Sequence, residues 1–167
     1  MSEVPEGVDL SGFMRKPPRP TATMTLTRDG PNGSEVLLGL RSETMAAFPG
    51  YWAFTGGGVS KVDAAAVDSF SVLDIQHGKA IACILRETCE ELGIAPNGDH
   101  VISIDEFARF DVIKDKANWL SHAEDCNIPV NTDNINILGH RVTPPFGPVQ
   151  FDNCLLYTSD AADDQAS

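Results

Sequence analysis

Three carboxylates fall on one stripe of a single expected helix. Glu87, Glu90 and Glu91 are three and four residues apart, so at about 3.6 residues per turn their side chains project side by side. Like charges at this spacing repel one another, and something positive must gather them. A hard divalent cation suits three carboxylates better than zinc, which prefers Cys and His. The pattern therefore predicts a site for a hard divalent cation.

The helix that carries these carboxylates is expected to run from about 78 to 92. It has an apolar face that would pack on a core, and Gly93 supplies the left-handed residue that commonly ends a helix. The apolar face consists of Ala80, Ile81, Ile84 and Leu85.

The run from Arg86 to Ile94 resembles the second half of the Nudix signature. In that signature Arg-Glu is followed by an aliphatic-type residue, any residue, Glu-Glu, any residue, Gly and an aliphatic residue, as in Arg86-Glu87-Thr88-Cys89-Glu90-Glu91-Leu92-Gly93-Ile94. The resemblance implies an α/β (α+β) fold, the Nudix-type α/β/α sandwich with a mixed sheet. It also implies a hydrolase that cleaves the diphosphate linkage of a nucleoside diphosphate derivative.

The first half of the signature is less regular. Gly56-Gly57-Gly58 follow a short strand, as in the family, but Gly78 stands where a glutamate is expected eight residues before Arg86, and an insert covers 59–77. If the insert folds back, one of its acids takes the place of that glutamate; otherwise each is a solvated loop residue. The candidates are Asp63, Asp68 and Asp74.

The resemblance also implies roles for the motif residues. Glu87, Glu90 and Glu91 would be the ligands of Mg²⁺ or Mn²⁺, and Glu87 is also a candidate for the general base. Arg86 would hold a glutamate in position through a planar, two-pronged pair. The alternative for Arg86 is a surface salt bridge at helical spacing.

Several residues are candidates for contact with substrate. Arg41 would meet an anionic phosphate, and Gly57 and Gly58 would let the backbone approach the ligand closely. Trp52 and Phe54 either stack on a base or belong to the core. More loosely, the stretches 36–42, 49–50 and 141–148 resemble the coenzyme A diphosphatase branch of the family, so coenzyme A or an acyl-CoA is a candidate substrate. The alternative function is a Nudix-fold binding module without turnover.

The amino-acid composition limits the classes of partner that the chain is expected to bind. A formal net charge of −12 over 167 residues argues against a nucleic-acid surface, which needs a basic stripe. No segment is long enough to span a bilayer, and the acidic start has no secretory signal. A small nucleotide-type substrate is therefore the expected partner, and the oligomeric state is left open. The cysteines show no CxxC pairing and are interpreted as reduced thiols of a cytoplasmic protein; they are Cys83, Cys89, Cys126 and Cys154.

Residues 1–19 are expected to form an extended, proline-containing lead-in, and 20–153 an incomplete Nudix domain. Beyond the central helix, strands, helices and an undetermined segment are expected. The strands are 21–27 and 35–40, paired as a hairpin, then 51–54 and 101–104, with extended segments at 140–143 and 149–153. The helices are 105–114 and 116–126, and 131–137 is undetermined.

The end of the chain has an unusual sequence. Residues 154–164, Cys-Leu-Leu-Tyr-Thr-Ser-Asp-Ala-Ala-Asp-Asp, resemble the in-frame translation of a transposase-type sequencing adapter. We therefore expect 154–167 to be an artefactual tail and the natural domain to be truncated. The alternative is a genuine strand at 154–157 followed by a polar tail.

Overall fold

The computed structural model describes residues 6–7, 17–45, 48–70, 75–97, 100–128, 132–144 and 149–160. Its strands are β1 (Arg19–Gly30), β2 (Gly33–Val36), β3 (Gly39–Leu40), β4 (Trp52–Ala53), β5 (Thr55–Gly58), β6 (Ile94–Asn97), β7 (His100–Ser103), β8 (Asn136–Val142) and β9 (Phe151–Asp160). Its helices are α1 (Lys61–Ala66), α2 (Ile75–Leu92), α3 (Glu106–Lys114) and α4 (Trp119–Asp125), with 3-10 turns at Val67–Ser69 and Lys116–Asn118.

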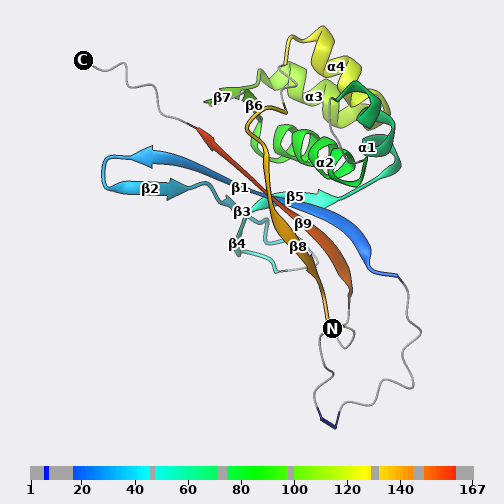
Figure 1. Ribbon diagram of the computed structural model, residues 1–167. Helices are drawn as coiled ribbons and strands as arrows, with labels where there is room; N and C mark the ends of the chain where they lie inside the picture. Colours follow the sequence, from blue (N-terminus) through cyan, green and yellow to red (C-terminus); the bar gives the residue numbers. More distant parts are fainter. Residues whose placement is uncertain are drawn as a thin grey trace.

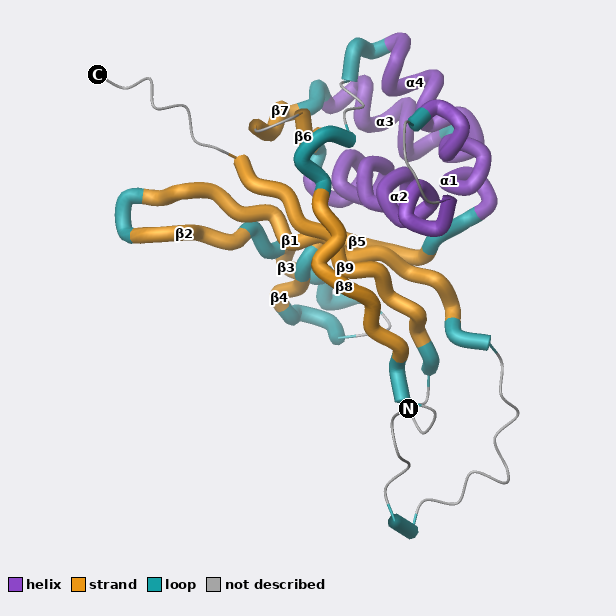
Figure 2. The backbone as a smooth tube through the Cα atoms, in the orientation of Figure 1, coloured by secondary structure: helices purple, strands orange, loops and turns teal. Residues whose placement is uncertain are grey.

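A five-stranded mixed sheet forms the centre of the molecule. Its strand order is β2-β1-β9-β8, and β5 pairs with β1 as well. One edge of β1 pairs with β9 in parallel along nearly its whole length, while the other edge pairs antiparallel with β5 and then with β2 (Figure 2). This topology brings residues 19–28 and 151–160 side by side.

The helices gather on one side of this sheet (Figure 1). The central helix α2 packs on β1 and β5, and α1 and α3 pack on α2. A mixed sheet with helices packed against it confirms the expected α+β class. No helix among the described residues is long and apolar enough to cross a membrane.

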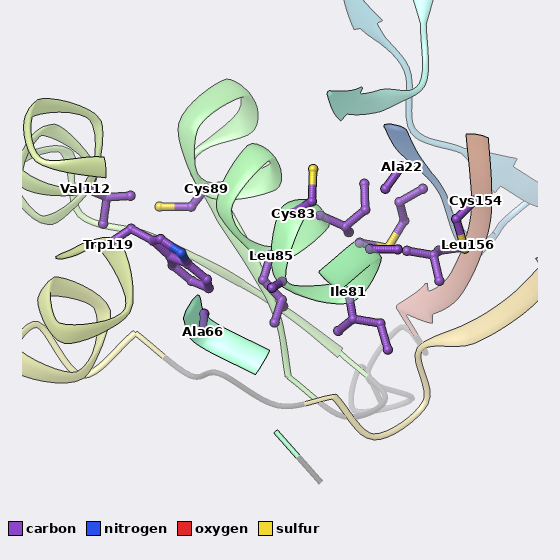
Figure 3. Packing of buried hydrophobic residues seen from close by; sticks show 14 residues of the cluster. Ala22, Ala66, Ile81, Cys83, Leu85, Cys89, Val112, Trp119, Cys154 and Leu156 are labelled. Atoms are coloured by element: carbon purple, nitrogen blue, oxygen red, sulfur yellow. The ribbon is translucent and has the colours of Figure 1, made fainter. Parts of the chain in front are cut away.

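The core lies between α2 and the sheet (Figure 3). Alternate residues of β1 point into it because successive side chains of a strand face opposite sides. On α2 the buried side chains cover most of the helix, and α3 and α4 extend the cluster. Members of the cluster include Ala22, Met24, Ile81, Ile84, Leu85, Cys89, Val112, Trp119, Cys154 and Leu156.

Several expected elements differ in their bounds. The first hairpin forms, but its second strand ends at Val36, and Gly39–Leu40 pairs instead with Trp52–Ala53. The three glycines belong to β5 and pair with β1, which makes them part of the sheet. The central helix begins at Ile75 because the insert itself is partly helical, and Gly78 is buried inside it. The segment that stayed undetermined contains the start of β8.

The strand β9 runs across the boundary expected after Asn153. Cys154, Leu156 and Thr158 are buried, since an alternating pattern places every second residue against α2. Residues 161–167 lie outside the described residues. The four cysteines form no disulfide within the described residues: Cys126 is exposed and the other three are buried.

Candidate active site

A buried ion pair between Arg86 and Asp63 organises the site. Arg86 Nε lies 2.8 Å from Asp63 Oδ1, and Nη2 lies 3.0 Å from Oδ2. The Asp63 side chain is fully buried and that of Arg86 is 4% exposed. Arg86 therefore forms the planar, two-pronged pair that its geometry favours, with an aspartate of the insert as partner. The surface salt bridge considered for Arg86 is excluded by this burial.

Asp63 reaches Arg86 because the insert folds back as α1. Ser60 precedes this helix, and both its backbone N–H and its hydroxyl donate to Asp63 Oδ2 over 2.8 Å. Asp63 is thus held by two residues, and neither of its oxygens is left without a donor. Of the other candidates in the insert, Asp68 is exposed and Asp74 lies outside the described residues. The interpretation of Asp63 as a solvated loop acid is wrong.

Arg86 also contacts two of the motif glutamates. Its Nη1 lies 2.9 Å from Glu87 Oε1 and 3.1 Å from Glu90 Oε1. Burial alone lowers the pKa of Arg86, but the hydrogen bonds and charges of Asp63, Glu87 and Glu90 outweigh it and raise the pKa overall. The guanidinium therefore stays charged and spans the gap between Asp63 and the motif glutamates.

Glu90 has a second cationic partner. The ammonium group of Lys116, from the 3-10 turn before α4, pairs with Glu90 Oε2. The Glu90 side chain is 9% exposed, whereas that of Lys116 is 51% exposed. One partner of Glu90 is therefore fixed inside the protein and the other is at the surface.

Glu87 lies against the backbone of β5. A methyl group added at Gly57 would collide with the Glu87 carboxylate, so the absence of a side chain there makes room for it. Burial raises the pKa of Glu87; Arg86 opposes this rise and the charges of Glu90 and Glu91 add to it. Glu87 is consequently the motif carboxylate whose environment shifts it toward holding a proton.

Glu91 is held by the same strand. Its Oε2 accepts hydrogen bonds from Thr55 Oγ1 at 2.8 Å and from the backbone N–H of Gly56 at 3.3 Å. Gly56 has a φ of 155°, and a methyl group there would collide with the carbonyl oxygen of Ala22. Only glycine fits this position, and it places a backbone donor beside Glu91.

Two cavities meet near Glu91 and Arg41, which line both of them. The larger has a volume of about 580 Å³, and we call it the arginine cleft. It is lined by Arg19, Thr21, Ala22, Thr23, Arg41, Met45, Gly56, Gly57, Gly58, Glu91, Arg141, Thr143, Pro144, Phe151 and Asn153. The candidate substrate residues Arg41, Gly57 and Gly58 thus lie on one cleft with Glu91.

The smaller cavity has a volume of about 300 Å³ and includes Phe54. Phe54 is 45% exposed and Trp52 is 65% exposed, so the assignment of these two aromatics to the core is wrong. Phe54 stays available for contact with a ligand in this cavity.

The donor set suits a hard cation, although the described residues form no closed group of three or more His, Cys, Asp or Glu side chains that could hold a metal. Glu87 Oε2 and Glu91 Oε1 accept no hydrogen bond from the described residues, so each has lone pairs to offer. Glu90 joins them only if the exposed Lys116 moves away from its Oε2.

Sequence reasoning missed several residues of the site. The spacing Ser60-x-x-Asp63 is a helix-capping pattern and would have predicted α1 inside the insert. Arg109 donates to the backbone oxygen of Glu90 over 2.6 Å and so secures the end of α2. Arg19, Arg141 and Lys116 reach the site only through the tertiary fold, and no local pattern marks them.

The chain resembles two solved structures. A Nudix hydrolase from Alicyclobacillus acidocaldarius is 26% identical and superposes with a TM-score of 0.70 over 87% of this chain and 71% of that one. A MutT/Nudix family protein from Enterococcus faecalis is 21% identical with a TM-score of 0.43, over 93% of this chain and 39% of that one. No protein-family model matches the chain. No curated protein matches it either.

Proposed function

We propose that this chain, a Nudix hydrolase by its fold and its glutamate motif, cleaves the diphosphate linkage of a nucleoside diphosphate derivative. Coenzyme A or an acyl-CoA is the candidate substrate that its sequence favours. The observation that carries the proposal is the juxtaposition of Glu91 and Arg41 on one cleft, next to the glutamates that Arg86 orders.

Glu87, Glu90 and Glu91 are the residues that would hold Mg²⁺ or Mn²⁺. Such a cation, when bound, neutralises the diphosphate and lowers the pKa of a water molecule. Arg86 fixes the carboxylates of Glu87 and Glu90 before a cation binds, and the side chain of Lys116 is the group that would have to move. Glu91 is oriented from the opposite side by Thr55 and Gly56.

Glu87 is the candidate base. Efficient general bases have a pKa raised toward the working pH, and burial shifts Glu87 in that direction. Arg41 lines the cleft beside Glu91, where its guanidinium would pair with a phosphate oxygen of the substrate.

The proposal is tested by a product assay on coenzyme A, ADP-ribose and dinucleoside polyphosphates, with magnesium or manganese and with a chelator. We expect metal-dependent cleavage within the diphosphate bridge of at least one compound. Absence of cleavage from all of them with both metals would contradict the proposal.

A binding module without turnover is the second candidate. This candidate is favoured by Gly78, which is buried at the position where the family has a further glutamate. It is also favoured by Asp63, because its carboxylate is hydrogen-bonded to Arg86 and Ser60 and cannot replace that glutamate. Calorimetric binding of the same compounds without any cleavage would favour the module over the enzyme.

A further inference from the structure

We infer that Arg19 and Arg141 bind a phosphate of the substrate that is separate from its diphosphate bridge. They would thus select nucleoside diphosphate derivatives that carry an additional phosphomonoester. This inference rests on the proposed function, because it assigns the diphosphate to the glutamate side of the arginine cleft.

The register of the sheet places both arginines on the floor of the cleft. Arg141 of β8 is the cross-strand partner of Asn153 in β9, and Asn153 is the partner of Thr21 in β1. Arg19 lies two residues before Thr21, so it shares the face of Thr21, whereas Ala22 and Met24 face the core. Arg19 and Arg141 flank β9 from its two sides and are offset by two residues along it, so their backbones are about 12 Å apart. The Arg19 guanidinium lies beside Gly58 of β5, and turning its side chain toward β9 would let it share an anion with Arg141.

The floor between the arginines is polar and ordered. The hydroxyls of Thr21 and Thr23 donate to Asn153 Oδ1 over 3.0 Å and 3.3 Å. This leaves the NH₂ group of Asn153 as a further donor next to Arg141 in the register. The floor therefore presents donors from β1, β8 and β9 to an incoming group, and donors are what a phosphate requires.

The charge of the cleft points to the same class of ligand. The chain as a whole carries a net charge of −12, yet among the described residues the cleft is lined by three arginines and by a single carboxylate, Glu91. Within the described part of the chain, neither Arg19 nor Arg141 forms an ion pair, whereas Arg28 at the far end of β1 pairs with Glu35. Arg19 and Arg141 are thus cations that an anionic ligand would neutralise.

Arg141 and Glu91 lie at opposite ends of the cleft, and the Arg19 guanidinium lies between them, beside Gly58. Gly58, Thr21, Asn153 and Arg141 are register partners across β5, β1, β9 and β8, so the row spans about 14 Å of strand spacing. Glu91 is hydrogen-bonded at the β5 end of this row, through Gly56. A diphosphate at the glutamates therefore leaves Arg141, with Arg19 turned toward it, for a second anionic group.

The experiment compares substrates that differ by one phosphate. Coenzyme A and dephospho-coenzyme A share the diphosphate bridge and differ in a phosphomonoester on the ribose. We expect the wild-type chain to cleave coenzyme A with a kcat/KM at least 10-fold higher, mainly through KM. Arg19→Gln and Arg141→Gln should each reduce this preference several-fold, and the double variant should abolish it.

The matched control is Arg28→Gln, which removes an arginine from the same strand outside the cleft and should keep the preference. Equal kcat/KM for both substrates, or an unchanged preference in the double variant, would overturn the inference and leave the proposed function intact. If neither compound is cleaved, coenzyme A is not the substrate, and calorimetric affinities for the same pair still decide the inference. Equal affinities in wild type and double variant would overturn it.

Discussion

The Arg86 guanidinium donates two hydrogen bonds, of 2.8 Å and 3.0 Å, to the Asp63 carboxylate in the interior of the protein, and the two residues are 23 positions apart in the sequence. The insert that carries Asp63 is therefore part of the active site's support. Arg86 in turn contacts Glu87 and Glu90, so any change at Asp63 acts on the metal-binding candidates through one intermediate.

Asp63→Asn should lower the free energy of unfolding by about 3–5 kcal/mol, because it leaves a buried guanidinium without its main counter-charge. Urea denaturation measures this change. The control Asp68→Asn alters an exposed acid of the same segment and should stay within about 0.5 kcal/mol of wild type. A decrease in the free energy of unfolding below about 1 kcal/mol for Asp63→Asn would show that the ion pair contributes little to the stability of the fold.

Gly57→Ala should reduce turnover by at least about 10-fold with little change in melting temperature, because the added methyl group displaces the end of the Glu87 side chain and leaves the core alone. Steady-state kinetics and a thermal melt provide the two readouts. In Gly58→Ala the same methyl group lies 3.7 Å from Arg19 and does not touch Glu87, so a much smaller loss is expected. Equal losses in the two variants would contradict the role given to Gly57.

Lys116→Met should bind Mg²⁺ or Mn²⁺ several-fold more tightly than wild type, since the lysine ammonium competes with a cation for Glu90. Calorimetric titration of the metal into substrate-free protein measures the affinity. Lys114→Met, two residues earlier and at the end of α3, is the matched control. Weaker metal binding in Lys116→Met would contradict this competition and would mean that Lys116 favours metal binding.

Glu87→Gln should stabilise the metal-free protein near neutral pH. Burial raises the pKa of Glu87 on folding. The protonated carboxyl group therefore makes its full contribution to stability below the ordinary carboxyl pKa, and this contribution is lost as the pH rises through the pKa of the folded state. The variant has no such loss, and its advantage in unfolding free energy should grow from about pH 4 to about pH 7. Denaturant titrations across this range measure it. An advantage that shrinks with rising pH would contradict the direction of the shift.

Part of this site could be predicted because its residues are local in sequence. Glu87, Glu90 and Glu91 share a stripe by helical spacing alone, and Gly93 adopts the left-handed conformation expected at the end of α2, with a φ of 66°. The hairpin of β1 and β2 follows from its turn residues in the same way.

The remainder depends on long-range pairing, which one sequence does not encode locally. Asn153 meets Thr21 across 132 positions because β1 and β9 run in parallel, and this pairing together with that of β8 and β9 brings Arg19 toward Arg141. The partner of Arg86 was expected among the glutamates, but a buried guanidinium requires more counter-charge than one of them provides, and Asp63 provides it. The interpretation of residues 154–167 as an adapter-derived tail stays a prediction, and β9 contains the first seven of them.

The central claim is that the glutamates of α2 hold the cation required for diphosphate cleavage, and turnover of Glu90→Gln and Glu91→Gln at limiting magnesium tests it most directly. Each variant should lose turnover by orders of magnitude on the best substrate while its melting temperature stays close to that of wild type, because it keeps the shape of the side chain and deletes a cation ligand. Glu124→Gln on the exposed side of α4 should retain wild-type turnover. Unchanged turnover in both Glu90→Gln and Glu91→Gln would contradict the account.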